Sequence, residues 1–212
     1  PNAGAHALGV YRIKGDANIF EGAIFEDIGM KAPRRSLSDF GVSGNKNVFY
    51  RCRFIVRGSS PYGYGDMYGK GGGSAVFTRK HSCMGIGGNE NRIEDCYFRV
   101  QSFGHCLHMH GARGTIFRNL HLKGVMRRGA DIYKEKEGPA AKFDYKKKFP
   151  PWEEGEPIPK DEMICLTEDG IRAYSGKTKN TTVENCTVRE MRGGITIVQD
   201  RNSKVKNCTV LN

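Results

Sequence analysis

Hydrophobic and polar positions alternate along most of this chain and recur as one short motif. The motif is rich in Val, Ile, Phe and Thr and is too short for a helix, which predicts a strand unit. Its copies are Asn180–Val188, Asn202–Val210, Asn91–Phe98 and Asn47–Phe54, with looser copies at Thr115–Leu122 and Ala23–Met30. Each copy has a central apolar slot, filled in turn by Ile28, Cys52, Cys96, Leu120, Cys186 and Cys208.

The spacing of the slots predicts a solenoid. Successive slots lie 24, 44, 24, 66 and 22 residues apart, which equals one, two, one, three and one steps of about 22 to 24 residues. At this step the chain holds about nine turns, one of them hidden near Ser74–Thr78. One turn cannot bury its apolar face alone, so stacked turns must form a continuous core.

Polar residues at fixed positions predict the bends of each turn. The residue before the slot suits a tight, left-handed bend and, when stacked, a hydrogen-bonded ladder. These residues are Asp27, Arg51, Asp95, Asn119, Asn185 and Asn207. A second strand precedes each copy, at Gly9–Gly15, Phe40–Gly44, Met84–Gly88, Leu107–Gly111, Gly170–Tyr174 and Gly194–Val198. We expect the slot cysteines to be small buried hydrophobes, with a Cys186–Cys208 disulfide within reach but not required.

The combined pattern, Gly-x-Ile-x-Ile-x-Gly followed by Asn-x-x-Val-x-Asn-Cys-x-Val, resembles the right-handed parallel β-helix of the pectate-lyase-like superfamily. The resemblance implies an all-β solenoid over nearly the whole chain. That superfamily includes lyases and hydrolases of acidic polysaccharides, epimerases and phage tailspikes. Its lyases often use calcium, which makes calcium the candidate cofactor, although neither the calcium-binding Asp cluster of pectate lyases nor the paired Asp of polygalacturonases is evident.

The solenoid is expected to form a single domain over residues 1–212, as part of a longer chain. Residues 134–162 interrupt the repeat with charged and Pro-rich sequence. We predict that they form a flap beside a binding groove, the alternative being a loop for oligomer contacts. The Gly- and Tyr-rich loop 58–73 offers aromatic rings for stacking on sugars, or else packs on its own rings.

The charge balance points to a polyanionic partner. Lys and Arg number 34 against 23 Asp and Glu, a formal net charge of +11. No nucleic-acid-binding motif and no apolar run long enough to span a membrane is visible. An acidic polysaccharide suits the resembled fold better than nucleic acid does, so the resemblance implies an acidic polysaccharide as the partner and a secreted or periplasmic location. The alternative is a plain soluble basic surface. The sequence does not indicate an oligomeric state.

The strand around Leu107–Gly111 carries the candidate chemistry. Alternation places Leu107 and Met109 inward and the two histidines between and after them outward. Stacking is expected to bring residues of neighbouring turns, about 5 Å apart, onto the same patch. The expected order is Gly85 and Gly87 on the turn before the histidines, then Asp131 and Tyr133, then Arg172 and Tyr174. The predicted catalytic residues are His108, His110, Asp131, Tyr133, Arg172 and Tyr174. The predicted substrate-binding residues are Arg127, Arg128, Lys134, Tyr62, Tyr64 and Trp152.

This set of residue types suits β-elimination on an acidic sugar. A histidine exchanges protons near neutral pH, and an Arg holds a carboxylate. We predict an enzyme, a polysaccharide lyase, on an acidic or sulfated polymer. The alternatives are a non-catalytic adhesin, tailspike-like segment or carbohydrate-binding module, and a glycoside hydrolase, which needs two facing carboxylates. A His-x-His metal site with Asp131 is a lesser alternative. His105 is expected only to bond backbone near a bend.

Overall fold

The computed structural model describes residues 11–27, 37–56, 81–101, 105–128, 161–165, 167–174, 177–198 and 200–212. Eighteen of their strands form three six-stranded sheets, in which every neighbouring pair is parallel. No helix capable of spanning a bilayer occurs in this part of the chain.

Each sheet collects one strand from every turn of the chain. Sheet A contains β1 (Tyr11–Ile13), β4 (Leu37–Val42), β7 (His81–Ile86), β10 (Leu107–Met109), β15 (Asp169–Tyr174) and β18 (Gly193–Val198). Sheet B contains β2 (Ile19–Glu21), β5 (Val48–Tyr50), β8 (Arg92–Glu94), β11 (Ile116–Arg118), β16 (Thr182–Glu184) and β19 (Lys204–Lys206). Sheet C contains β3 (Ile24–Asp27), β6 (Arg53–Val56), β9 (Tyr97–Val100), β12 (His121–Lys123), β17 (Thr187–Arg189) and β20 (Thr209–Leu211).

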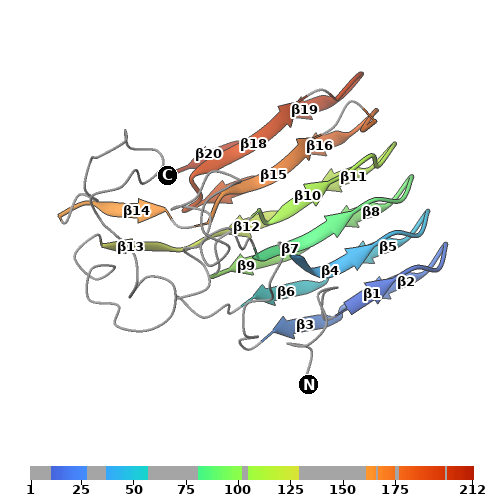
Figure 1. Cartoon of the computed structure of the whole chain (residues 1–212), viewed down its shortest axis with the longest axis horizontal. Helices are drawn as coiled ribbons and strands as arrows, with labels where there is room; N and C mark the ends of the chain where they lie inside the picture. Colours follow the sequence, from blue (N-terminus) through green and yellow to red (C-terminus); the bar gives the residue numbers. More distant parts are fainter. Residues whose placement is uncertain are drawn as a thin grey trace, which may run out of the picture.

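In its described ranges the chain passes through sheets A, B and C six times, and each passage is one coil, numbered here 1 to 6 from the N-terminal end (Figure 1). This is the predicted right-handed parallel β-helix, with the crossover hand that parallel strands favour. Between coils 4 and 5 the chain leaves the stack as an antiparallel ribbon of β13 (Met126–Arg128) and β14 (Met163–Cys165).

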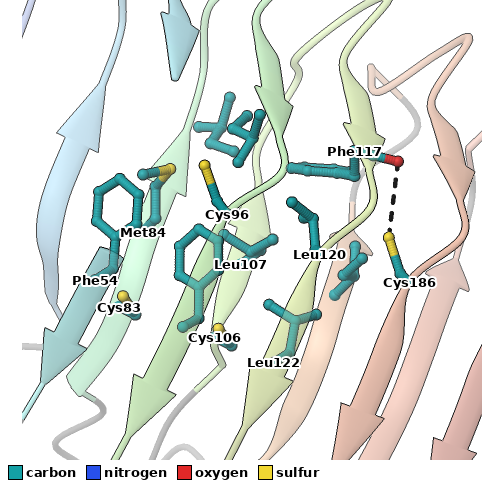
Figure 2. Packing of buried hydrophobic residues seen from close by; sticks show 14 of the residues in the cluster. Phe54, Cys83, Met84, Cys96, Cys106, Leu107, Phe117, Leu120, Leu122 and Cys186 are labelled. Carbon is teal, nitrogen blue, oxygen red and sulfur yellow. Dashed lines mark hydrogen bonds between the residues drawn. The ribbon is translucent and has the colours of Figure 1, made fainter. Parts of the chain in front are cut away.

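The core consists of columns of apolar side chains that occupy equivalent positions in successive coils (Figure 2). Phe25, Phe54 and Phe98 stack in sheet C, with ring centroids 5.0 and 4.6 Å apart. The slot residues Cys96 and Cys186 are buried beside them, as predicted, and burial raises the pKa of each thiol to about 12. All the cysteines are free, so the Cys186–Cys208 disulfide is not formed.

The bends between sheets B and C confirm the predicted role of the residue before the slot. Arg51, Asp95, Asn119, Asn185 and Asn207 all have positive φ angles, between 52° and 54°. The predicted ladder forms where amides stack: Asn119 Nδ2 donates to Asp95 Oδ1 at 2.7 Å, and Asn185 Nδ2 donates to Asn119 Oδ1 at 3.1 Å. An Asn or Asp here both tolerates the left-handed backbone and bonds to the next coil.

A second, buried ladder lies between sheets A and B. Asn18 Nδ2 donates to Asn47 Oδ1 at 2.8 Å, and Asn47 Nδ2 donates to Asn91 Oδ1 at 3.2 Å. Asn47 and Asn91 are fully buried. The Asn47 and Asn91 amides also bond backbone groups, since Asn47 Oδ1 accepts from the Asn18 N–H, Asn91 Oδ1 accepts from the Asn47 N–H, and Asn91 Nδ2 donates to the Gly44 carbonyl. The ladder therefore holds coils 1 to 3 in register.

The alignment predicted for the first coil was wrong by five residues. Phe20 pairs with Phe49 and Phe25 pairs with Phe54, so Ala23 occupies the slot in place of Ile28. Gly22, with φ of 63°, makes the bend that was assigned to Asp27. Gly and Ala meet the same steric requirements as Asn and Cys, but they carry a weaker sequence signal.

The prediction of about nine turns was also wrong. β6 pairs directly with β9, and β12 pairs directly with β17, so the 44- and 66-residue gaps are each a single step that contains a long excursion. No coil intervenes, and Ser74–Thr78 lies outside the described residues. Each of these gaps resembled several repeat steps because the length of its insertion is close to a whole number of steps.

Candidate functional site

The candidate site lies on the outer face of sheet A in coils 3 to 5. His108 pairs with Gly85 on one side, as the sequence predicted, and directly with Arg172 on the other. Leu107 and Met109 point into the core and are fully buried, so the two histidines that alternate with them face outward. Gly85 projects no side chain beside His108.

The predicted place of Asp131 and Tyr133, between the histidines and Arg172, was wrong. β10 pairs directly with β15, so no strand separates His108 from Arg172. The predicted site residues Asp131, Tyr133, Lys134, Tyr62, Tyr64 and Trp152 lie outside the described residues.

Three further predicted residues have a described backbone position. Tyr174 ends β15 and pairs with Val198. Arg127 and Arg128 lie on β13, opposite Ile164 and Met163 of the ribbon, and not on a strand of sheet A.

His105 is the residue that the sequence interpretation most underrated. It was expected only to bond backbone, but its side chain is 2% exposed and lies between two carboxylates. Its Nδ1 is 3.0 Å from Asp169 Oδ2, and its Nε2 is 3.2 Å from Glu168 Oε2. The residue stands just before β10, outside the regular period, and this position hid its role. The one available signal was that Glu168 and Asp169 fall at the same point of the next coil.

Asp169 connects this buried histidine to the exposed face. Its Oδ2 accepts from Arg172 Nη1 at 2.8 Å, and its Oδ1 accepts from Thr196 Oγ1 at 2.8 Å. Burial alone would raise the pKa of Asp169, but the hydrogen bonds from His105, Arg172 and Thr196 outweigh it and hold the pKa well below its usual range. Asp169 is therefore a permanent anion that fixes the Arg172 guanidinium. Gly193 is required beside it, because a Cβ there would lie 2.0 Å from Asp169 Oδ1.

Glu168 extends the same network to coil 6. Its Oε1 accepts from Arg192 Nη2 at 2.5 Å. Arg172, Asp169, His105, Glu168 and Arg192 thus form a chain in which each carboxylate lies between His105 and an arginine, called here the His105 network. A protonated His105 would donate to both carboxylates, whereas a neutral imidazole can donate to only one.

The three histidines form a stack from the interior to the surface. The ring centroids of His105 and His108 are 4.7 Å apart, and those of His108 and His110 are 4.0 Å apart. His110 is exposed at the outer end. Partial burial of its ring, together with the nearby positive charges of His105 and Arg172, lowers its pKa below the usual value. His110 is therefore neutral at pH 7 and can accept a proton.

The described residues contain no group of three or more His, Cys, Asp or Glu side chains arranged to hold a metal ion. The His-x-His metal site predicted with Asp131 depends on a residue outside that set. Among the described residues, this face of sheet A combines a proton acceptor, His110, with a cation, Arg172, that Asp169 holds in place.

Comparison with known proteins adds little to this geometry. The chain matches no protein-family model and no curated protein. Among solved structures, the A-module of the mannuronan C-5 epimerase AlgE6 from Azotobacter vinelandii aligns with 96% of this chain at 10% identity and a TM-score of 0.29. The chain covers 58% of that module's length. A likeness this weak supports no conclusion about function, and the assignment as a parallel β-helix rests on the strand pairings.

Proposed function

We propose that this β-helix is a carbohydrate-active enzyme that acts outside the cytoplasm, and more closely a lyase that cleaves an acidic polysaccharide by β-elimination. The observation that carries the proposal is that His110, exposed and with a lowered pKa, lies on the same face of sheet A as Arg172, which Asp169 holds in place. Elimination from a uronic acid needs these two functions, a base for the proton next to the carboxylate and a cation for the developing charge.

The proposed reaction assigns one step to each group. Arg172 binds the carboxylate of the sugar, and a ring nitrogen of His110 takes the proton from the adjacent carbon. The electron pair of that C–H bond forms a carbon–carbon double bond as the glycosidic C–O bond breaks. The leaving oxygen takes a proton from His108, which carries a proton on both ring nitrogens for this step and whose ring is 4.0 Å from that of His110. The proton that His110 has accepted then restores this form of His108. The products are an unsaturated uronate and a new chain end.

The glycoside hydrolase alternative has less support. Hydrolysis by an acid and base pair requires two carboxylates that face the substrate. Glu168 and Asp169, the carboxylates of this face, are both engaged by His105 and by an arginine. A binding module without catalysis is the remaining alternative, and it predicts retention of the polymer with no product.

The direct test is an ultraviolet assay for unsaturated uronate on pectate, alginate, glycosaminoglycans and ulvan, with and without calcium. His110→Ala should reduce the rate at least about 100-fold, since a general base contributes about 10²–10⁴-fold. His121→Ala is the matched control, because His121 is an exposed histidine on sheet C. The assay should run beside one for reducing ends.

The outcomes separate the alternatives. Signal lost in His110→Ala and kept in His121→Ala supports the lyase at this site. Signal kept in both variants moves the site elsewhere. Reducing ends without unsaturation indicate a hydrolase, and solvent deuterium at the acidic carbon without cleavage indicates epimerisation by the same proton abstraction. No reaction with retained polymer binding leaves a binding module.

A further inference from the structure

A file of three stacked cations borders the candidate site. Arg113, Lys179 and Arg201 occupy the same position of the turn between sheets A and B in coils 4, 5 and 6, joined by parallel backbone bridges. Successive coils are about 4.8 Å apart, so the three side chains leave the surface in one line along the solenoid axis. Arg113 and Arg201 are exposed, and Lys179 is half-buried.

The first half of the same column shows that the fold does not require these charges. There the position is held by Asp16, Asn45 and Asn89, which form a ladder: Asn45 Nδ2 donates to Asp16 Oδ1 at 3.1 Å, and Asn45 Oδ1 accepts from the Asn89 backbone N–H at 2.9 Å. Cations cannot bond to one another in this way, and like charges on neighbouring strands repel. In coils 4 to 6 a stabilising ladder is thus replaced by a repulsive file, which an anion bound from outside would offset.

The file begins three residues after His110. Between them the Gly111 N–H donates to Thr178 Oγ1 at 3.0 Å, which ties the loop of coil 4 to the loop of coil 5 that carries Lys179. Among the described residues no carboxylate is paired with Arg113, Lys179 or Arg201. The file therefore follows the histidine strand directly along the chain, on coils that are tied to one another.

We propose that Arg113, Lys179 and Arg201 form a subsite that binds successive carboxylates of a polyuronate lying along the solenoid axis. This deepens the proposed function, on which it rests for the identity of the polymer. A polyuronate presents one anion per sugar, and the Asn and Ser residues beside the file offer hydrogen bonds to its hydroxyls. Single-stranded nucleic acid fits less well, because its binding sites stack bases on aromatic rings, and Arg113, Lys179 and Arg201 have no aromatic side chain within two residues along the chain.

The test replaces the three cations with Asn, the residue that coils 2 and 3 carry at this position. Binding of a defined oligogalacturonate and an alginate oligomer is measured by calorimetry at low and high salt. The triple variant should bind about 10- to 100-fold more weakly at low salt, as expected for three exposed ion pairs. The dependence of binding on salt should also become shallower.

The matched control is a second file of three cations on sheet C, where Arg99, Lys123 and Arg189 stack in coils 3 to 5. Replacing these with Thr removes the same charge from another face, and Lys123 is already paired with Glu190 at 3.1 Å. We expect this variant to lose less than about threefold in affinity. Circular dichroism verifies that both variants fold.

Equal losses in the two triple variants would mean a general charge effect and would overturn the subsite, as would no loss in either. Tighter binding of oligothymidylate or of a sulfated glycan than of polyuronate, lost in the Asn variant, would also overturn it. The proposed function fails separately: weaker binding in the Asn variant without any lyase product keeps the subsite and removes the lyase. Unchanged binding in the Asn variant together with full lyase activity would keep the lyase and remove the subsite.

Discussion

Asp169→Asn should destabilise the protein by about 2 kcal/mol at pH 7. The substitution keeps the shape of the side chain but removes the charge that receives hydrogen bonds from His105, Arg172 and Thr196. A charge-assisted bond is worth roughly 1 kcal/mol more than a neutral one, which gives about 3 kcal/mol for three bonds. Solvent screening of the partly exposed Arg172 lowers the total to about 2 kcal/mol.

The destabilisation should depend on pH in one direction. The pKa of Asp169 in the folded protein lies well below its unfolded value, so its contribution is fully present above about pH 5 and is lost as the pH falls. Below the unfolded pKa near 3.9, the wild type loses about 1.4 kcal/mol of this contribution per pH unit. The difference between wild type and Asp169→Asn should therefore close near about pH 2.5.

Urea unfolding followed by circular dichroism measures the difference. With a slope near 3 kcal/mol/M, the midpoint should fall by about 0.7 M at pH 7. Asp95→Asn is the matched control, because Asp95 is exposed, also accepts a side-chain bond, and sits in a left-handed bend that Asn tolerates. A difference that stays constant from pH 7 to pH 2.5, or one no larger than that of Asp95→Asn, would refute the role given to the charge.

Three further outcomes are expected. Gly193→Ala should displace the carboxylate of Asp169 and cost about 1–3 kcal/mol in thermal or urea unfolding, whereas Gly87→Ala should be tolerated, since a Cβ there meets nothing closer than 3.8 Å. Asn91→Ala should cost about 1–3 kcal/mol by the same measurement, because it leaves buried partners of the ladder unsatisfied. If His110 is the base, activity should rise with pH through a pKa below 6.5. A rising limb of the pH profile with its midpoint above pH 7 would contradict the lowered pKa of His110.

The parts of the fold that the sequence predicted correctly are those in which packing repeats. The columns that include Phe49 and Phe54 are periodic because each coil must bury the same positions, and the left-handed bends are visible because only a few residue types accept that backbone. The same periodicity predicted Gly85 beside His108 and Arg172 on the same face, but it wrongly placed a further turn between His108 and Arg172. The strand partners could be predicted to this extent because, in a parallel stack, each strand pairs with the strand at the same position of the next coil.

The parts that the sequence did not predict come from the one connection without a fixed length. Sheets B and C are always joined by two residues, for example Arg51 and Cys52, which the left-handed bend fixes. The connections from sheet C to sheet A differ in every coil, from residues 190–192 in one to residues 124–168, which include β13 and β14, in another. Counting turns fails there, because an insertion of any length leaves the next strand in register.

This variable connection is also where the His105 network is built. His105 and Glu168 lie in it just before sheet A, and Arg192 lies in the shortest example. The bend between sheets B and C has a fixed backbone, so few residue types are tolerated there. The connection from sheet C to sheet A varies in length, so it can carry charged residues without disturbing the core columns. The solenoid therefore separates two tasks: sheets B and C hold the stack, and the approach to sheet A supplies the buried charges that position Arg172 beside His110. Substitutions in this approach should thus alter activity more than they alter the register of the coils.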